Sequence, residues 1–189
     1  LSNAMGLAQS NAKRMLAYSS VSHAGYLALI FFGANSLSLY NLAFYLFAYS
    51  LSTIGVFLTL IWVEKIKRET SFEAFKGLAK TEPIAAVATA VSLLSMAGIP
   101  LTAGFVAKFS IFAQAMNGAA FLVLIAVIGS ALSIAYYLRL IISMFFHKES
   151  SFKTSEKMSI TYNIVAIFII VAILALGIYP DLFKMQFGL

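Results

Sequence analysis

The chain has 189 residues, of which 61% are hydrophobic and 11% are charged, and its mean hydropathy is +0.93. Soluble domains are about 45–50% apolar and about 25% charged, so this composition excludes an ordinary water-soluble fold and a disordered chain. Cysteine is absent and only two histidines occur, which argues against disulfides, thiolate metal sites and iron–sulfur clusters, and against a haem or zinc site built by this chain alone. The net charge of +6 points to membrane orientation rather than to nucleic-acid binding.

Five apolar segments are long enough to cross a bilayer, which takes about 20 helical residues. The ten-residue alternation of membrane β-barrels is not seen. We therefore predict an all-α polytopic transmembrane bundle with five full spans, the third of them broken. The spans are residues 15–34, 39–63, 84–116 (broken), 119–146 and 160–179, with residues 1–9 as the end of a preceding helix and residues 64–83 as a cytoplasmic amphipathic segment.

Positive charges divide the loops into two classes. When successive loops alternate between the two sides of the membrane, ten of the 13 Lys and Arg residues fall on one side, and Lys184 falls in the tail on the other side. By the positive-inside rule the side with ten cations is cytoplasmic, which puts the C-terminus on the non-cytoplasmic side. The ten are Lys13, Arg14, Lys65, Lys67, Arg68, Lys76, Lys80, Lys148, Lys153 and Lys157.

The polar segment 64–83 contains a possible helix start. Thr70 and Glu73 have the spacing of a capping box, and Phe72, Phe75 and Leu78 follow at helical spacing. The pattern favours a short amphipathic helix on the cytoplasmic membrane face. A solvated loop is the alternative.

The third span contains a helix break and a lysine. Gly98 and Pro100 interrupt the apolar run, and proline removes a backbone donor and clashes with the preceding turn. Broken helices near the midplane are a common way for transporters to build ion sites. Lys108 follows two turns later, where a charge is costly, and no acidic residue lies within a span. We predict that Lys108 is a proton relay whose partner is water, a hydroxyl or another chain; a structural cation is the alternative.

Weaker candidates for a proton path lie in the first two spans. His23 shares a helical face with Ser19 and Tyr26. Tyr45 and Tyr49 form a polar stripe on the second span, and Lys13 marks the cytoplasmic start of the first. Each has a structural alternative: a packing histidine, interhelical hydroxyl contacts and interface anchoring.

Two long motifs resemble the antiporter-like membrane subunits of respiratory complex I. The first is QSNAKRMLAYSSVSHAGY, residues 9–26, and the second is LSMAGIPLTAGFVAKF, residues 94–109. The resemblance extends over essentially the whole chain and is strongest to the subunit N branch, because the M branch usually has a glutamate at the position of Lys108. It implies that this chain is the C-terminal portion of such a subunit, containing its second inverted repeat.

The resemblance also implies a function. The chain would be a proton-translocating part of an NADH:quinone oxidoreductase in a bacterial inner membrane, with other membrane subunits and the lipid bilayer as partners. No nucleotide-binding fingerprint or hydrolytic site is present. No cofactor or metal is therefore expected on this chain, and NADH, flavin, iron–sulfur clusters and quinone are expected on other subunits. A subunit of a multisubunit cation/proton antiporter and a structural fragment without a transport role are the alternatives.

Overall fold

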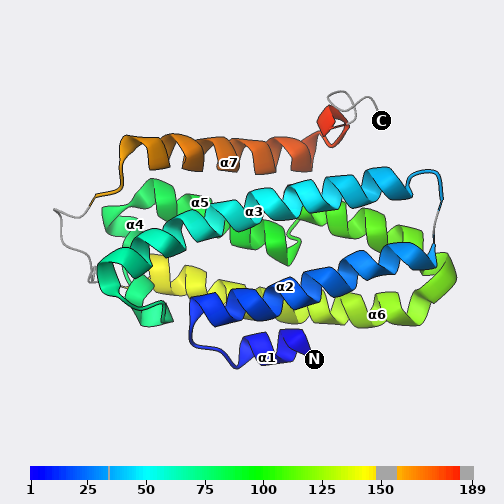
Figure 1. Cartoon of the computed structure of the whole chain (residues 1–189), viewed down its shortest axis with the longest axis horizontal. Helices are drawn as coiled ribbons and strands as arrows, with labels where there is room; N and C mark the ends of the chain where they lie inside the picture. The colour runs from blue at the N-terminus through cyan, green and yellow to red at the C-terminus, as the bar shows by residue number, and fades with distance from the viewer. Residues whose placement is uncertain (34, 148–156, 184–189) are drawn as a thin grey trace.

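The computed structural model describes residues 1–33, 35–147 and 157–183, and the chain within these ranges is helical without a named strand. The long helices run side by side along the longest axis of the molecule, with α7 on one side and the short α1 on the other (Figure 1). In chain order the elements are α1 (Ser2–Leu7), α2 (Ala12–Ala28), η1 (Leu29–Phe32), α3 (Ser38–Lys67), η2 (Phe72–Phe75), α4 (Leu78–Thr81), α5 (Pro83–Ala97), α6 (Ala103–Phe145) and α7 (Ile160–Ile178).

The part of the chain that the structure describes passes five times along the bundle. α6 contains two helices, because the backbone of Ala119 is non-helical (φ −153°, ψ 48°) and the chain reverses direction there (Figure 1). α5 and the first part of α6 therefore make the third pass, and the rest of α6 makes the fourth. Four helices of the described part are long and apolar enough to cross a membrane, and α5 is a shorter apolar helix. The predicted all-α bundle with a broken third segment is confirmed, while the span boundaries in a membrane stay predictions.

Local signals in the sequence set several helix ends. The side chain of Asn11 accepts a hydrogen bond from the backbone N–H of Arg14 and so caps the start of α2. Pro83 occupies the first turn of α5, where its missing N–H costs nothing. α3 ends at Lys67, and its C-cap residue Arg68 takes up a left-handed conformation with φ 58°.

The segment between α3 and α5 differs from the predicted amphipathic helix. It forms one 3₁₀ turn, η2, capped by Ser71 rather than by Thr70, and then the single turn of α4. Gly77, with φ 70°, separates the two turns. Phe75 and Leu78 are buried in the main hydrophobic cluster, so the segment packs into the end of the bundle instead of lying on its surface.

Backbone hydrogen bonds hold this segment in place. Ala12 donates to the carbonyl of Thr70 at 2.8 Å, and Phe72 donates to the carbonyl of Ser10 at 2.9 Å. The Asn11 amide also donates to the Thr70 hydroxyl at 2.9 Å. Because Thr70 is engaged by the start of α2, it is not free to cap a helix of its own.

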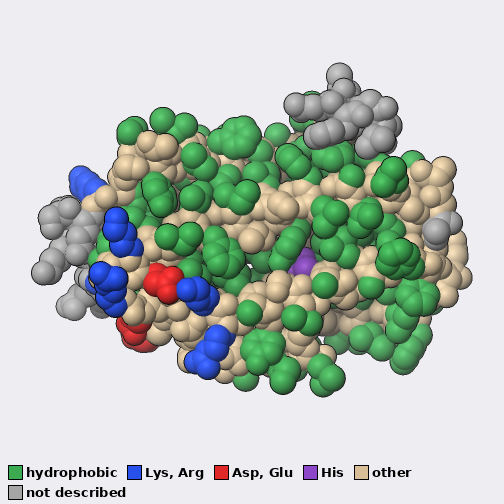
Figure 2. Space-filling model, viewed as in Figure 1, with side chains coloured by type: hydrophobic (Ala, Val, Ile, Leu, Met, Phe, Trp, Pro, Cys, Tyr) green, Lys and Arg blue, Asp and Glu red, His purple; other side chains and the backbone are tan. Residues whose placement is uncertain are grey.

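Charged side chains gather at one end of the bundle, where α2 begins and α3 ends (Figure 2). Lys13 forms an ion pair with Glu64 there, with 2.8 Å between Nζ and Oε1, and Lys76 pairs with Glu73. This clustering agrees with the predicted cation asymmetry. Three of the cations used in that prediction, Lys148, Lys153 and Lys184, lie outside the described residues.

The topology can be tested by cysteine labelling, because the chain has no cysteine of its own. Lys65→Cys lies at the cationic end, and Asn117→Cys lies at the reversal between the two parts of α6; both side chains are exposed. We expect a membrane-impermeant maleimide to label Lys65→Cys only from the cytoplasmic side and Asn117→Cys only from the other side. Labelling of both positions from one side would contradict the arrangement.

Candidate functional site

The helix break between α5 and α6 is built mainly by Gly98. This residue is the C-cap of α5 with φ 86°, and its N–H and that of Ile99 both donate to the carbonyl of Leu94 at 3.0 Å. This is the usual way in which a glycine ends a helix. Leu101 is also left-handed, with φ 71°. Two left-handed residues flank Pro100, so the break does not depend on the proline alone.

The break supplies a carbonyl to Lys108. The Lys108 side chain is 5% exposed, and its ammonium donates to the carbonyl oxygen of Ala97 at 3.0 Å and to the hydroxyl of Ser130 at 2.8 Å. Ala97 is the last residue of α5, where carbonyls have no partner within the helix and the helix dipole favours a cation. The aromatic ring of Tyr26 lies below the ammonium, 5.1 Å from Nζ to the centroid.

The partner of Lys108 was predicted to be water, a hydroxyl or another chain, and Ser130 provides the hydroxyl. No described carboxylate forms an ion pair with this lysine. A buried charge is costly unless it is well hydrogen-bonded. The site therefore stabilises the ammonium with dipoles and one aromatic face rather than with an opposite charge.

A small cavity joins Lys108 to three other predicted residues. Its volume is about 10 Å³, which is close to the space that one water molecule needs. His23 from α2 and Tyr45 and Tyr49 from α3 lie on its wall together with Lys108. The structure thus brings four of the five predicted proton-path residues to one place.

His23 is fixed by the two tyrosines. Its Nδ1 lies 2.8 Å from the Tyr45 hydroxyl, and its ring centroid is 4.6 Å from that of Tyr49. His23 and Tyr45 are buried, at 4% and 2% exposure. The hydroxyl of Tyr45 and the imidazole of His23 can each donate or accept a hydrogen bond. The pair therefore adds two groups to the cavity wall that could pass a proton on.

Lys13 is the predicted residue that the structure does not bring to the cavity. It lies at the surface in its ion pair with Glu64, with Nζ at 2.8 and 3.0 Å from the two carboxylate oxygens. Exposed ion pairs of this kind contribute about 0–1 kcal/mol to stability. The described geometry therefore agrees with the anchoring alternative for Lys13.

Sequence reasoning missed Ser130, Ser95 and Ser52. Ser95 lies on the α5 face that turns toward α3, and its hydroxyl accepts hydrogen bonds from Ser52 at 3.0 Å and from the backbone N–H of Gly104 at 3.1 Å. It therefore joins α3, α5 and the start of α6. A Cβ at Gly104 would lie 1.9 Å from the carbonyl oxygen of Ser95, so only glycine allows the two half-helices to approach this closely. Serines at helical spacing were visible in the sequence, but their partners on other helices were not.

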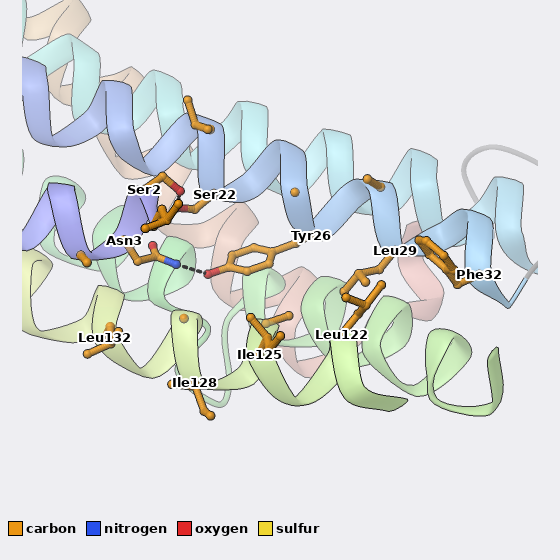
Figure 3. Close-up of a pocket in the computed structure, with 17 residues that line it drawn as sticks. Ser2, Asn3, Ser22, Tyr26, Leu29, Phe32, Leu122, Ile125, Ile128 and Leu132 are labelled. Carbon is orange, nitrogen blue, oxygen red and sulfur yellow. Dashed lines mark hydrogen bonds between the residues drawn. The ribbon is translucent and has the colours of Figure 1, made fainter. Parts of the chain in front are cut away.

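A wider groove opens beside the site, between α1, α2 and the second part of α6 (Figure 3). Its volume is about 460 Å³. At its polar end the Asn3 amide donates to the Tyr26 hydroxyl at 2.8 Å (Figure 3). The Tyr136 hydroxyl in turn donates to the side-chain oxygen of Asn3 at 3.0 Å. Tyr26 thus contacts Lys108 through its ring and takes part in the polar end of the groove through its hydroxyl.

Comparison with known proteins places the chain in a family. Residues 1–133 match the family described as "NADH:quinone oxidoreductase/Mrp antiporter, TM". The chain belongs to this family of membrane subunits. It is 38% identical over 183 residues to NADH-quinone oxidoreductase subunit N of Flavobacterium psychrophilum, covering 96% of this chain and 39% of that protein. It is 39% identical over 180 residues to the subunit N of Rhodococcus opacus, covering 94% and 33%. The chain thus spans little more than a third of these relatives.

Solved structures agree with this assignment. A chain of respiratory complex I from Thermus thermophilus with bound aureothin superimposes with a TM-score of 0.82 at 34% identity, covering 96% of this chain and 41% of that one. A chain of the Mrp complex from Dietzia sp. DQ12-45-1b has a TM-score of 0.83 at 22% identity, covering 96% and 42%. The second likeness shows the shared fold alone. The predicted resemblance to the antiporter-like subunits, and to the subunit N branch, is confirmed.

The break can be tested at Gly98. A Cβ there would lie 3.1 Å from Cδ of Lys108, and φ is 86°. We expect Gly98→Ala to lower the free energy of unfolding by about 1–2 kcal/mol, the cost of a left-handed L-residue, with more from displacement of the lysine. Reversible unfolding in mixed detergent micelles, followed by circular dichroism, measures this change.

Gly25→Ala is the matched control, because a Cβ there meets nothing within 4 Å and Gly25 lies inside α2. We expect this change to leave stability unaltered or to raise it slightly, by less than about 1 kcal/mol. Equal effects of the two substitutions would show that the left-handed conformation of Gly98 is not required.

Proposed function

We propose that the chain forms part of a proton-translocating membrane subunit of an NADH:quinone oxidoreductase, with Lys108 as its proton relay. The observation that carries the proposal is the buried ammonium at the helix break, beside a cavity shared with His23 and the two tyrosines. The subunit N relatives support the oxidoreductase over the antiporter alternative. NADH, flavin, iron–sulfur clusters and quinone would bind to other subunits of the complex.

In this proposal some residues stabilise the charged form of Lys108 and others form the path along which its proton moves. The carbonyl of Ala97 and the ring of Tyr26 hold the charged form of Lys108. A water molecule in the small cavity would take the proton from Nζ or return it, and His23 with Tyr45 would continue the hydrogen-bonded path. The electron-transfer reaction elsewhere in the complex would change the electrostatic field at Lys108 and so drive the release.

The membrane setting of the proposal is the inner membrane of a bacterium, with several spans and the cationic end in the cytoplasm. Two features support it: the relatives are bacterial membrane subunits, and the surface cations on the face shown in Figure 2 gather at one end of the bundle. Other membrane subunits would cover those bundle faces that lipid does not. Lys108 would then exchange its proton with the non-cytoplasmic side, since it lies on the half-helix that leads there.

Substitution of Lys108 tests the relay. Lys108→Met removes the charge and the proton, whereas Lys108→Arg keeps a charge that holds its proton at any accessible pH. We expect both variants to lower proton pumping per assembled complex by at least about tenfold, in line with the contribution of a positioned acid–base group. Proton uptake into membrane vesicles during NADH oxidation measures the effect.

Lys65→Met is the control, because Lys65 is an exposed cation at the end of α3 and its loss should leave pumping at the parental level. Parental pumping by Lys108→Arg together with impaired pumping by Lys108→Met would identify a structural cation instead. Parental pumping by Lys108→Met would overturn the relay altogether.

A further inference from the structure

The hydroxyl of Ser130 holds a position that neither the sequence pattern nor the family assignment singles out. It lies on the fourth pass of the chain, 2.8 Å from Nζ of Lys108, and it also donates to the carbonyl of Ala97 at 3.2 Å. Nζ, the Ser130 oxygen and the Ala97 oxygen therefore form a closed triangle, because Lys108 itself donates to Ala97 at 3.0 Å.

The three neighbours of Nζ are the Ala97 carbonyl, the Ser130 hydroxyl and the Tyr26 ring. They differ in whether they can stabilise the ammonium, the neutral amine or both. A carbonyl oxygen only accepts hydrogen bonds, and an aromatic face attracts a cation. Both therefore favour the ammonium. A neutral amine has a lone pair that needs a donor, and a serine hydroxyl can both donate and accept. Among the described contacts of Nζ, Ser130 is the one that can supply this donor.

We infer that Ser130 changes from hydrogen-bond acceptor to hydrogen-bond donor when Lys108 loses its proton. With the ammonium, the Ser130 oxygen accepts from Nζ and its hydroxyl donates to the carbonyl of Ala97, an arrangement that fits the distances of 2.8 and 3.2 Å. When Nζ gives its proton to water, the Ser130 hydroxyl rotates and donates to the lone pair of the amine. Ser130 keeps its own proton throughout, so the only proton transferred is the one exchanged between Nζ and water.

The exchange has a functional consequence that rests on the proposed relay. Once the water has passed the proton on, a buried amine without a donor would be poorly stabilised. With Ser130 the lysine has a hydrogen-bond partner before and after the transfer. Hydrogen bonds to charged groups are about twice as strong as neutral ones, so Ser130 stabilises the charged form more than the neutral form.

Other titratable groups around Nζ must be held constant in a test. His23 and Tyr26 face it from α2, and Tyr45 and Tyr49 face the shared cavity from α3. α5 has no titratable side chain, and on the second part of α6 the hydroxyls of Tyr136 and Tyr137 bond to Asn3 and Ser19. Substitution of Ser130 leaves all six groups in place, so a change in the pH dependence of pumping can be assigned to the hydroxyl.

The experiment compares three variants in the intact complex. Ser130→Ala removes the hydroxyl, and Ser130→Thr keeps it. Ser133→Ala is the control, because the Ser133 hydroxyl donates to the carbonyl of Ser130 at 2.6 Å and does not contact the lysine. We expect Ser130→Ala to reduce pumping per assembled complex by about tenfold and to shift its pH profile toward acid by about one unit. Ser130→Thr and Ser133→Ala should retain the parental profile.

Each outcome is decisive. A parental pH profile for Ser130→Ala, whether or not less complex assembles, would overturn the role of Ser130 and leave it as a packing residue. An acid shift of the same size in Ser133→Ala would also overturn it, because the effect would then come from the helix and not from the hydroxyl. If Lys108→Met pumps normally, the relay itself fails; if Lys108→Met is inactive while Ser130→Ala keeps the parental profile, only the inference about Ser130 fails.

Discussion

A buried ammonium needs acceptors that an unbroken apolar helix does not offer, and this requirement organises the centre of the molecule. In a continuous helix every interior carbonyl is already bonded to an N–H four residues later. The turn at Gly98 ends α5 and leaves the Ala97 carbonyl for Lys108. The same turn sets the path of the chain back toward that carbonyl, so that the lysine, eleven residues later in the sequence, reaches it. The helix break and Lys108 thus form one structural unit.

Close packing around the break holds the two half-helices and Lys108 in place. Ser95 joins the two half-helices through Gly104 and joins both to α3 through Ser52. Polar contacts between membrane helices are modest individually, at about 0.6–2 kcal/mol, but here several converge within one turn. The cavity that remains has room for about one water molecule. Such a site allows protons to move along few routes, which suits a relay better than an open channel would.

Much of this could be read from the sequence, because apolar length and the positions of Gly98, Pro100 and Lys108 are local signals. His23, Tyr45 and Lys108 were predicted as separate candidates, and their grouping was not. Periodicity places residues on one face of a helix but does not say which faces of different helices meet. Ser130 was missed for the same reason: its role arises from a contact across 22 residues. The segment at Thr70 was misjudged because its backbone bonds with the start of α2 override the capping-box pattern.

The central claim is that the site holds Lys108 in two protonation states. Its most direct test is nitrogen NMR of the full-length subunit with ¹⁵Nζ-labelled lysine in lipid nanodiscs, with the Lys108 signal assigned by its absence in Lys108→Arg. The account predicts that this signal moves reversibly between ammonium and amine positions across the pH range in which the complex pumps. An Nζ signal that keeps its ammonium position throughout that range would contradict the account.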